Sequence, residues 1–228
     1  MSETRTSERA PRRDAVRNDA RVLEAAREVL AESGPQACME DIAARAGVGV
    51  GTIYRRFSSK DALIDALVND VMDDLGEAAD HALAAVDGTG LESFLRALGE
   101  SFAAHRRYAS LMLGRDDEVR AERIRTDIGE LTARAVAAGE LGPAATDGDV
   151  MALVWSLRAL AEMAGDIAPD AWRRHVDIHL EGLRAMGPLS PVSAMTGEQV
   201  RQISTAPVPA IPASERRSRR SASSDARQ

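Results

Sequence analysis

The sequence predicts an all-α protein, in which a small N-terminal head of three helices is followed by a larger helical body. Aromatic residues make up only 3% of the 228 residues, and Ala, Leu, Val and Met supply most of the 44% that are apolar. This composition suits closely packed helices better than sheets. Apolar residues also recur three and four positions apart along successive segments, which is the spacing of helices with one buried face.

The chain is expected to divide into four parts. Residues 1–13 form a polar, arginine-rich arm that we expect to be disordered, and residues 14–62 form the head. Residues 63–187 form the body, and residues 188–228 form a disordered tail rich in Pro, Ser and Arg. A chain of this length can bury one large core or two small ones.

The head is expected to begin with a helix from about Asp14 to Ser33, which Gly34-Pro35 ends. Its apolar stripe comprises Val22, Leu23, Ala26, Val29 and Leu30. This stripe is expected to close a small core with Ile42, Ile53 and Phe57 from the two helices that follow.

Those two helices are short, and a glycine turn joins them. The first is predicted over Met39–Ala46, where Gly47 suits the left-handed conformation that ends a helix. The second is predicted over Val50–Arg56 and carries several hydrogen-bond donors. Two short helices around a tight turn are typical of the helix-turn-helix motif, which places its second helix in the major groove of DNA.

The run IAARAGVGVGTIYRRFSSKDAL resembles the DNA-binding signature of the TetR family of bacterial regulators. The matching residues are Ile42, Ala43, Ala46, Gly47, Val48, Gly51, Thr52, Ile53, Tyr54, Phe57, Lys60 and Leu63. Gly49 stands where the family usually has Ser, and Cys38 stands where it usually has Thr. Because Cys is a poor N-cap, we expect the Met39 helix to begin less firmly than in the family.

The resemblance implies which residues meet DNA. Thr52, Tyr54 and Lys60 would contact phosphates, while Val50 and Arg55 would reach base edges. Arginine can form two hydrogen bonds to guanine, which supports the second role. The candidate set is completed by Arg45, Gly51, Arg12 and Arg13. The arm that holds the last two is either a solvated tail or a segment that follows the DNA.

A long helix is predicted after Phe57, capped by Ser58 or Ser59 and running to Asp87-Gly88. About 27 residues make a rod of about 40 Å. The resemblance implies that this helix couples the binding of a ligand to the binding of DNA. Five further helices are predicted over Leu91–His105, Tyr108–Leu113, Asp117–Ala138, Asp147–Ala164 and Pro169–Met186.

The body is expected to bind a small molecule and a second subunit. The candidate pocket residues are His105, Tyr108, Met112, Trp155 and Arg158, and Met72, Met112, Met151 and Met163 are either pocket or ordinary core. The resemblance implies a four-helix dimer interface built from residues 147–164 and 169–186 of both chains. Its candidate residues are Leu157, Trp172, Val176, Leu180 and Leu183.

Charge is divided unevenly along the chain. Residues 1–60 carry a net charge of +2, residues 61–186 carry −12 and residues 187–228 carry +3. Because the phosphates of DNA attract a more basic head and repel an acidic body, this distribution would orient the chain on DNA. The RRSRR run at residues 216–220 is either solvated or adds nonspecific attraction to DNA.

Other classes of function find little support in the sequence. One cysteine permits no internal disulfide, and neither a signal peptide nor a membrane-spanning run is visible, so a cytoplasmic protein is expected. His175 and His179 have metal-ligand spacing but lack a third ligand, so we expect interface histidines, no metal and no cofactor. Without an acid–base or nucleophile set, an enzyme is the weaker hypothesis.

The preferred hypothesis is a ligand-responsive regulator, most simply a repressor, that binds a palindromic operator as a dimer and is released by a small molecule. A DNA-binding regulator without a ligand is the alternative, and a helical enzyme is the least favoured. The sequence leaves the ligand, the operator and the choice between repression and activation open.

Overall fold

The computed structural model describes residues 9–112, 115, 118–185, 187 and 193–205, with side chains from residue 18 onward. All its regular elements are helices within those ranges. In chain order they are α1 (Arg9–Ser33), the 3₁₀ helix η1 (Gly34–Gln36), α2 (Met39–Ala46), α3 (Val50–Arg56), α4 (Lys60–Ala84), α5 (Gly90–His105), α6 (Ala109–Met112), α7 (Glu118–Ala138), α8 (Asp147–Ala164), α9 (Ala171–Arg184) and α10 (Gly197–Thr205). The predicted all-α class is confirmed.

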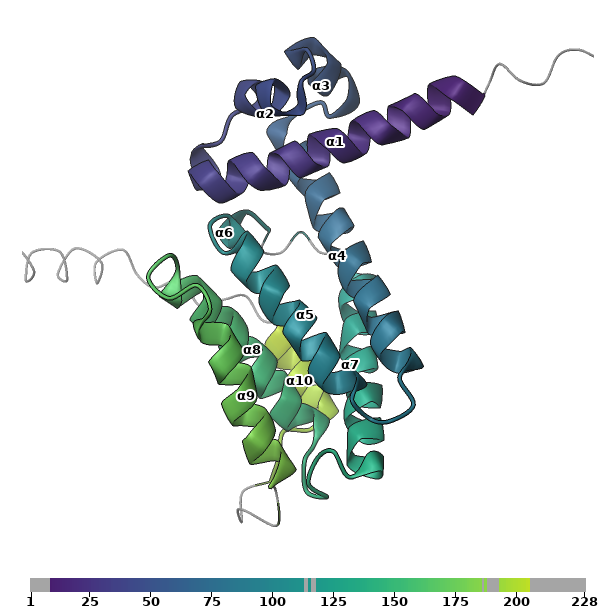
Figure 1. Cartoon of the computed structure of the whole chain (residues 1–228), viewed down its shortest axis with the longest axis vertical. Helices are drawn as coiled ribbons and strands as arrows, with labels where there is room; N and C mark the ends of the chain where they lie inside the picture. The colour runs from purple at the N-terminus through teal and green to yellow at the C-terminus, as the bar shows by residue number, and fades with distance from the viewer. Residues whose placement is uncertain (1–8, 113–114, 116–117, 186, 188–192, 206–228) are drawn as a thin grey trace, which may run out of the picture. The chain divides into compact units, whose positions relative to one another are not determined.

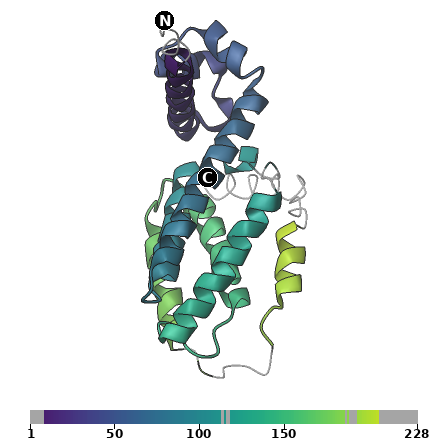
Figure 2. The same cartoon turned by 90° about the vertical axis from the view of Figure 1, so that its right-hand side faces the viewer.

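Residues up to Ala194 form one compact unit, in which α4 connects two groups of helices. The helices α1, α2 and α3 lie at the N-terminal end of α4 (Figure 1). The remainder of α4 packs against α5 and α7, while α8 and α9 pack on each other and on α5. Figure 2 shows the same α4 continuing from the head alongside α7. α10 belongs to a second compact unit.

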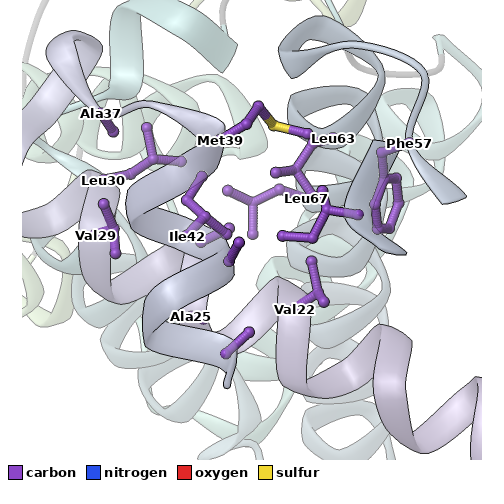
Figure 3. Packing of buried hydrophobic residues seen from close by; sticks show 14 of the residues in the cluster. Val22, Ala25, Val29, Leu30, Ala37, Met39, Ile42, Phe57, Leu63 and Leu67 are labelled. Atoms are coloured by element: carbon purple, nitrogen blue, oxygen red, sulfur yellow. The ribbon is translucent and has the colours of Figure 1, made fainter. Parts of the chain in front are cut away.

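The head has the predicted core. α1 contributes Val22, Val29 and Leu30, and all three are almost completely buried. They meet Ile42 of α2, and Figure 3 shows Met39, Phe57, Leu63 and Leu67 around the same centre. Because Leu63 and Leu67 lie on α4, the first two turns of the long helix belong to the head core.

The glycine turn between α2 and α3 has the expected backbone. Gly47 has φ 66° and ψ 37°, the left-handed conformation that glycine adopts without a steric penalty. Arg21 of α1 donates from Nη2 to the carbonyl of Ala46 at 2.7 Å, which satisfies a carbonyl at the end of α2. α1 therefore helps to hold the turn between α2 and α3 in its orientation.

Cys38 is the N-cap of α2, and its thiol takes part in two hydrogen bonds with Asp41. Its Sγ accepts from the Asp41 amide at 3.4 Å and donates to the Asp41 carboxylate at 2.9 Å. The second bond joins the two side chains, so the pair differs from a capping box, in which the acid accepts from the backbone amide of the N-cap residue. How firmly α2 begins stays a prediction.

Several limits and caps differ from the predictions, and α4 ends at Ala84 rather than at Asp87-Gly88. α1 begins at Arg9 rather than Asp14, so Arg12 and Arg13 lie on its helical backbone and not in an irregular arm. Thr146 rather than Asp147 caps α8, because Asp149 completes a capping box with it. α9 begins at Ala171, and α10 stands within the segment expected to be irregular. Residues 1–8 and the RRSRR run lie outside the described residues.

Candidate nucleic-acid interface and body cavity

α3 presents two different faces. Ile53 and the following Phe57 are 1% and 6% exposed and anchor the helix in the head core. Val50 and Tyr54 lie on another face and are 39% and 45% exposed. Because they lie four residues apart, these two side chains form one small exposed patch on α3.

Gly51, Thr52 and Arg55 extend the exposed surface of α3. Gly51 is exposed, and a Cβ added there would meet nothing within 4 Å outside the helix's own backbone. Arg55 is exposed and Thr52 is partly buried. The side chains of Val50, Tyr54 and Arg55 are thus all accessible to a ligand as large as a duplex.

Lys60 starts α4 beside this surface. Its Nζ donates to the carbonyl of Pro35 at 2.7 Å, and Ser59 caps the helix by accepting from the Ala62 amide at 3.1 Å. A carbonyl is a neutral acceptor, so the ammonium charge is not cancelled by this bond. Together with the positive end of the α4 dipole, it makes a favourable seat for a phosphate.

Two other arginines of the helix pair are bound to carboxylates of α1. Arg45 donates from Nη1 to Glu28 at 2.8 Å and from Nη2 to Glu32 at 2.7 Å. Its hydrogen bonds to these carboxylates raise the pKa of Arg45, while its bonds to Glu32 lower the pKa of that acid. Arg56 donates from Nε to Asp19 at 2.8 Å. Arg45 therefore joins α1 and α2 through two ion pairs, whereas Arg55 lies exposed on α3.

Arg12 and Arg13 lie on the N-terminal part of α1, where the structure describes the backbone but not the side chains. Their contact with DNA stays a prediction.

The body contains a cavity of about 150 Å³. It lies between α4, α5, α6 and α8 and is lined by Val68, Val71, Met72, Leu75, Ser101, Phe102, His105, Ala109, Met112, Arg158 and Glu162. Of the five predicted pocket residues, His105, Met112 and Arg158 are found there. Phe102 and the α4 valines lay on ordinary helical stripes, and nothing in their spacing distinguished them from other core residues.

Tyr108 and Trp155, the other two predicted pocket residues, do not line this cavity. Tyr108 is 1% exposed and belongs to the head core, where it packs with residues such as Leu63 and Leu67. Trp155 is partly buried on α8 and does not line the cavity. Met72 lines it, but Met151 is buried elsewhere and Met163 is 83% exposed.

The five residues predicted for a subunit interface are buried within the single chain. Leu157, Trp172, Val176, Leu180 and Leu183 are all at most 8% exposed, because α9 packs against α5 and α8. They fill the core of one subunit, so little of their surface is available to another. Their contact with a second subunit stays a prediction.

His175 and His179 lie one turn apart with their ring centroids 4.1 Å apart. His175 Nε2 is 2.8 Å from Ser156 Oγ, and His179 Nδ1 is 2.9 Å from the His175 carbonyl. Burial, followed by the charge of His179, lowers the pKa of His175. Among the described residues, no group of three or more His, Cys, Asp or Glu side chains has the arrangement of a metal site.

None of the described helices is long and apolar enough to cross a membrane.

Comparison with known proteins assigns the chain to a family. The family model "Bacterial regulatory proteins, tetR family" matches residues 22–67, which contain α2 and α3. The crystal structure of a TetR transcription regulatory protein from Mycobacterium vanbaalenii is 35% identical, with a TM-score of 0.60, over 76% of this chain and 99% of that one. A TetR transcriptional regulator from Streptomyces coelicolor is 26% identical, with a TM-score of 0.60, over 74% of this chain and 99% of that one. The curated proteins contain no match.

The helix pair with its exposed α3 surface, the family match over that pair and the 35% identity across nearly the whole M. vanbaalenii regulator lead to one conclusion. The chain belongs to the TetR family of bacterial transcriptional regulators, which bind DNA and are not enzymes.

Proposed function

We propose that this regulator is a ligand-responsive repressor, which binds a palindromic operator as a homodimer in the cytoplasm and leaves it when a small molecule enters the body. Residues 14–62 act as the DNA-binding part and residues 63–187 as the ligand-binding and dimerisation part. The observation that supports the proposal best is the pairing of an exposed α3 surface with a largely apolar cavity against α4, the helix that both parts share.

At the DNA, we assign Val50 and Arg55 to base edges and Thr52, Tyr54 and Lys60 to phosphates. Tyr54 and Thr52 carry single hydroxyls, which cannot identify a base pair by two hydrogen bonds, whereas a guanidinium can. Lys60 offers a point charge at the N-terminus of α4. Arg45, held by Glu28 and Glu32, orients α2 rather than contacting the duplex.

The dimer surface is proposed on the outer face of α8 and α9, in place of the buried residues predicted from the sequence. Ala152, Ala159 and Met163 are exposed along α8, and Ile178 and Gly182 are exposed along α9. Small and apolar residues that follow one another at helical spacing let two helices approach closely. Because the face spans two antiparallel helices, a second copy related by a two-fold axis can complete a four-helix bundle.

Binding-site selection from random duplexes tests the function. The full-length protein should enrich a palindrome, and the purified protein should retard that duplex far more than a scrambled one. Selection of no preferred sequence would contradict the assignment of α3 to base readout. Selection of a palindrome that no small molecule releases would instead favour the alternative, a DNA-binding regulator without a ligand.

A further inference from the structure

The cavity of the body is mainly apolar, and it has room for a small apolar group. Val68, Val71 and Leu75 of α4 face Phe102 of α5 and Met112 of α6 across it. A cavity of about 150 Å³ lined by apolar side chains is of the size that holds a benzene ring. The part of a ligand that lies within it is therefore about one ring or a short chain.

The polar groups around this cavity carry no net charge. Arg158 donates from Nε to Glu162 Oε1 at 3.1 Å, and both side chains are about two-fifths exposed, so they form a compensated pair at the rim. Deeper in, His105 Nδ1 lies 3.2 Å from Ser101 Oγ. Burial, reinforced by the charge of Arg27, lowers the pKa of His105 to about 4, so its imidazole is neutral at pH 7. An ion entering here would lose its hydration without gaining an unpaired opposite charge.

The same histidine is connected to the head. His105 ends α5, and its ring meets the ring of Tyr108 edge-on, with the centroids 5.5 Å apart and the planes at 66°. Tyr108 is 1% exposed within the head core. Between them, Arg107 donates to the carbonyls of Ala31 and Glu32 at 3.1 and 2.7 Å, at the C-terminal end of α1. A single turn of chain, residues 105–108, thus touches the cavity, the end of α1 and the head core.

We propose that the cavity takes an uncharged, largely apolar small molecule with one hydrogen-bonding group for the His105 imidazole, and that this imidazole transmits occupancy to the head through Tyr108. The inference rests on the proposed function for its biological meaning, but its physical content concerns only the cavity and residues 105–108. A ligand that pulls or pushes the His105 ring changes its contact with a tyrosine that the head core holds tightly. The head then has two packings whose balance the ligand shifts.

Calorimetry on the full-length protein at pH 7.5 tests the ligand class with four probes of similar size. They are 4-ethylphenol, ethylbenzene, 4-ethylbenzoate and 4-ethylbenzylammonium. We expect 4-ethylphenol to bind at least tenfold more tightly than either ion and several-fold more tightly than ethylbenzene. Binding of either ion as tight as that of the phenol, or no binding of the two uncharged probes, would overturn the ligand class.

The His105→Leu variant tests the role of the imidazole, with Met112→Leu as a control from the same cavity wall. In His105→Leu the preference for 4-ethylphenol over ethylbenzene should fall to about one, while ethylbenzene still binds. Met112→Leu should keep the preference. An unchanged preference in His105→Leu would exclude the histidine as the polar contact.

Hydrogen–deuterium exchange of the α1–α3 amides tests transmission without using DNA. Saturating 4-ethylphenol should change exchange in these helices at least threefold in the unsubstituted protein and in Tyr108→Phe, which keeps the ring. It should leave the helices unchanged in Tyr108→Leu, although the probe still binds. If Tyr108→Leu does not fold, His105→Leu saturated with ethylbenzene supplies the same test, because it also lacks the ring contact.

The exchange readout separates this inference from the proposed function. A head that responds in the unsubstituted protein but selects no operator would contradict the repressor and support the transmission. A head that does not respond, or that responds equally in Tyr108→Leu, would overturn the transmission whatever the protein does on DNA.

Discussion

At the scale of single residues, the head separates arginines that stabilise the fold from those that are free to bind. Arg21 satisfies a carbonyl at the end of α2, and Arg45 joins α2 to two carboxylates of α1. Arg55 lies on the exposed surface of α3. Arginine therefore has two roles in the head: some arginines hold helices together, and others are free to bind. The sequence alone does not separate the two roles, because they depend on which acids and carbonyls lie nearby in the fold.

This division predicts different DNA-binding defects for Arg55 and Lys60. Arg55→Ala should weaken operator binding by about 1–3 kcal/mol and relax the preference at one base pair of each half-site, because a contact to a base edge is lost. Lys60→Ala should weaken all duplexes by a similar factor and reduce the log–log salt slope by about one per subunit. Anisotropy titrations with operator and scrambled duplexes at several salt concentrations measure both. Unchanged sequence preference in Arg55→Ala would move this residue to the phosphate contacts.

Burial of His105 predicts a stability that depends on pH. The pKa of this histidine is lowered from 6.5 to about 4 in the folded chain, so the unfolded chain binds the proton at the higher pH. The free energy of unfolding should therefore fall by up to about 3 kcal/mol as the pH is lowered from about 6.5 to 4. Urea denaturation across this range measures the change. The His105→Gln variant should lose most of that part of the slope, and an equal slope in both proteins would show that His105 is not its source.

At the scale of elements, helix packing depends on where glycine permits close approach. Gly99 lies in the interior of α5, and a Cβ there would stand 2.2 Å from Trp172 Cε3 and 2.5 Å from Cζ3. Trp172 is 2% exposed, so its ring has no free space into which to move. The close contact between α5 and α9 therefore requires a residue without a Cβ at position 99.

Replacing that glycine should reduce stability. We expect Gly99→Ala to lower the free energy of unfolding by about 1–3 kcal/mol, since overpacking displaces the indole. Gly129, in the interior of α7, provides the matched control, because a Cβ there meets nothing within 4 Å. Gly129→Ala should raise stability by about 0.5–1 kcal/mol through the better helix propensity of alanine. Urea melts of the two variants decide the comparison, and a Gly99→Ala protein as stable as Gly129→Ala would contradict it.

The sequence predicts the end of a helix well when the residues at that end determine it. The limits of α2 and α3 agree with their predictions, because glycines and a short apolar stripe fix both ends. The limits of α8 agree as well, although its cap is Thr146. The position of the Cys38 cap was predicted, but its bond to the Asp41 carboxylate was not, because residue propensities average over partners.

At the scale of the whole molecule, the sequence could not distinguish the core of one subunit from an interface between two. Leu157, Leu180 and Leu183 lie on good helical stripes, and periodicity says that a stripe is buried but not against which chain. The cavity lining has the same difficulty, since it combines residues from four helices that are distant in sequence. Such sets depend on tertiary packing, which no single segment encodes.

We predict that the chain forms a dimer through the outer face of α8 and α9. The unsubstituted chain should scatter light as a particle of twice the 24.4 kDa chain mass. Met163→Asp and Ile178→Asp should each produce monomers, because both side chains are exposed in one subunit and an unpaired charge would be buried in the dimer. Val86→Asp is the control, since Val86 is 98% exposed and lies between α4 and α5. Dimers that persist in both α8 and α9 variants would place the interface elsewhere.

The distribution of Lys60 and Cys38 has a practical consequence for labelling chemistry. They are the only lysine and the only cysteine of the sequence, and both lie in the head. Hydrogen bonding to Asp41 raises the pKa of the Cys38 thiol, so thiol reagents should react slowly there at neutral pH. Acetylating reagents, in contrast, find a single side-chain amine at the proposed phosphate seat. Mass spectrometry of the Lys60 peptide should show slower acetylation when operator is bound, and equal rates with and without operator would remove Lys60 from the contact surface. Amine chemistry can thus act as a reporter of DNA occupancy that leaves every side chain of the body unmodified.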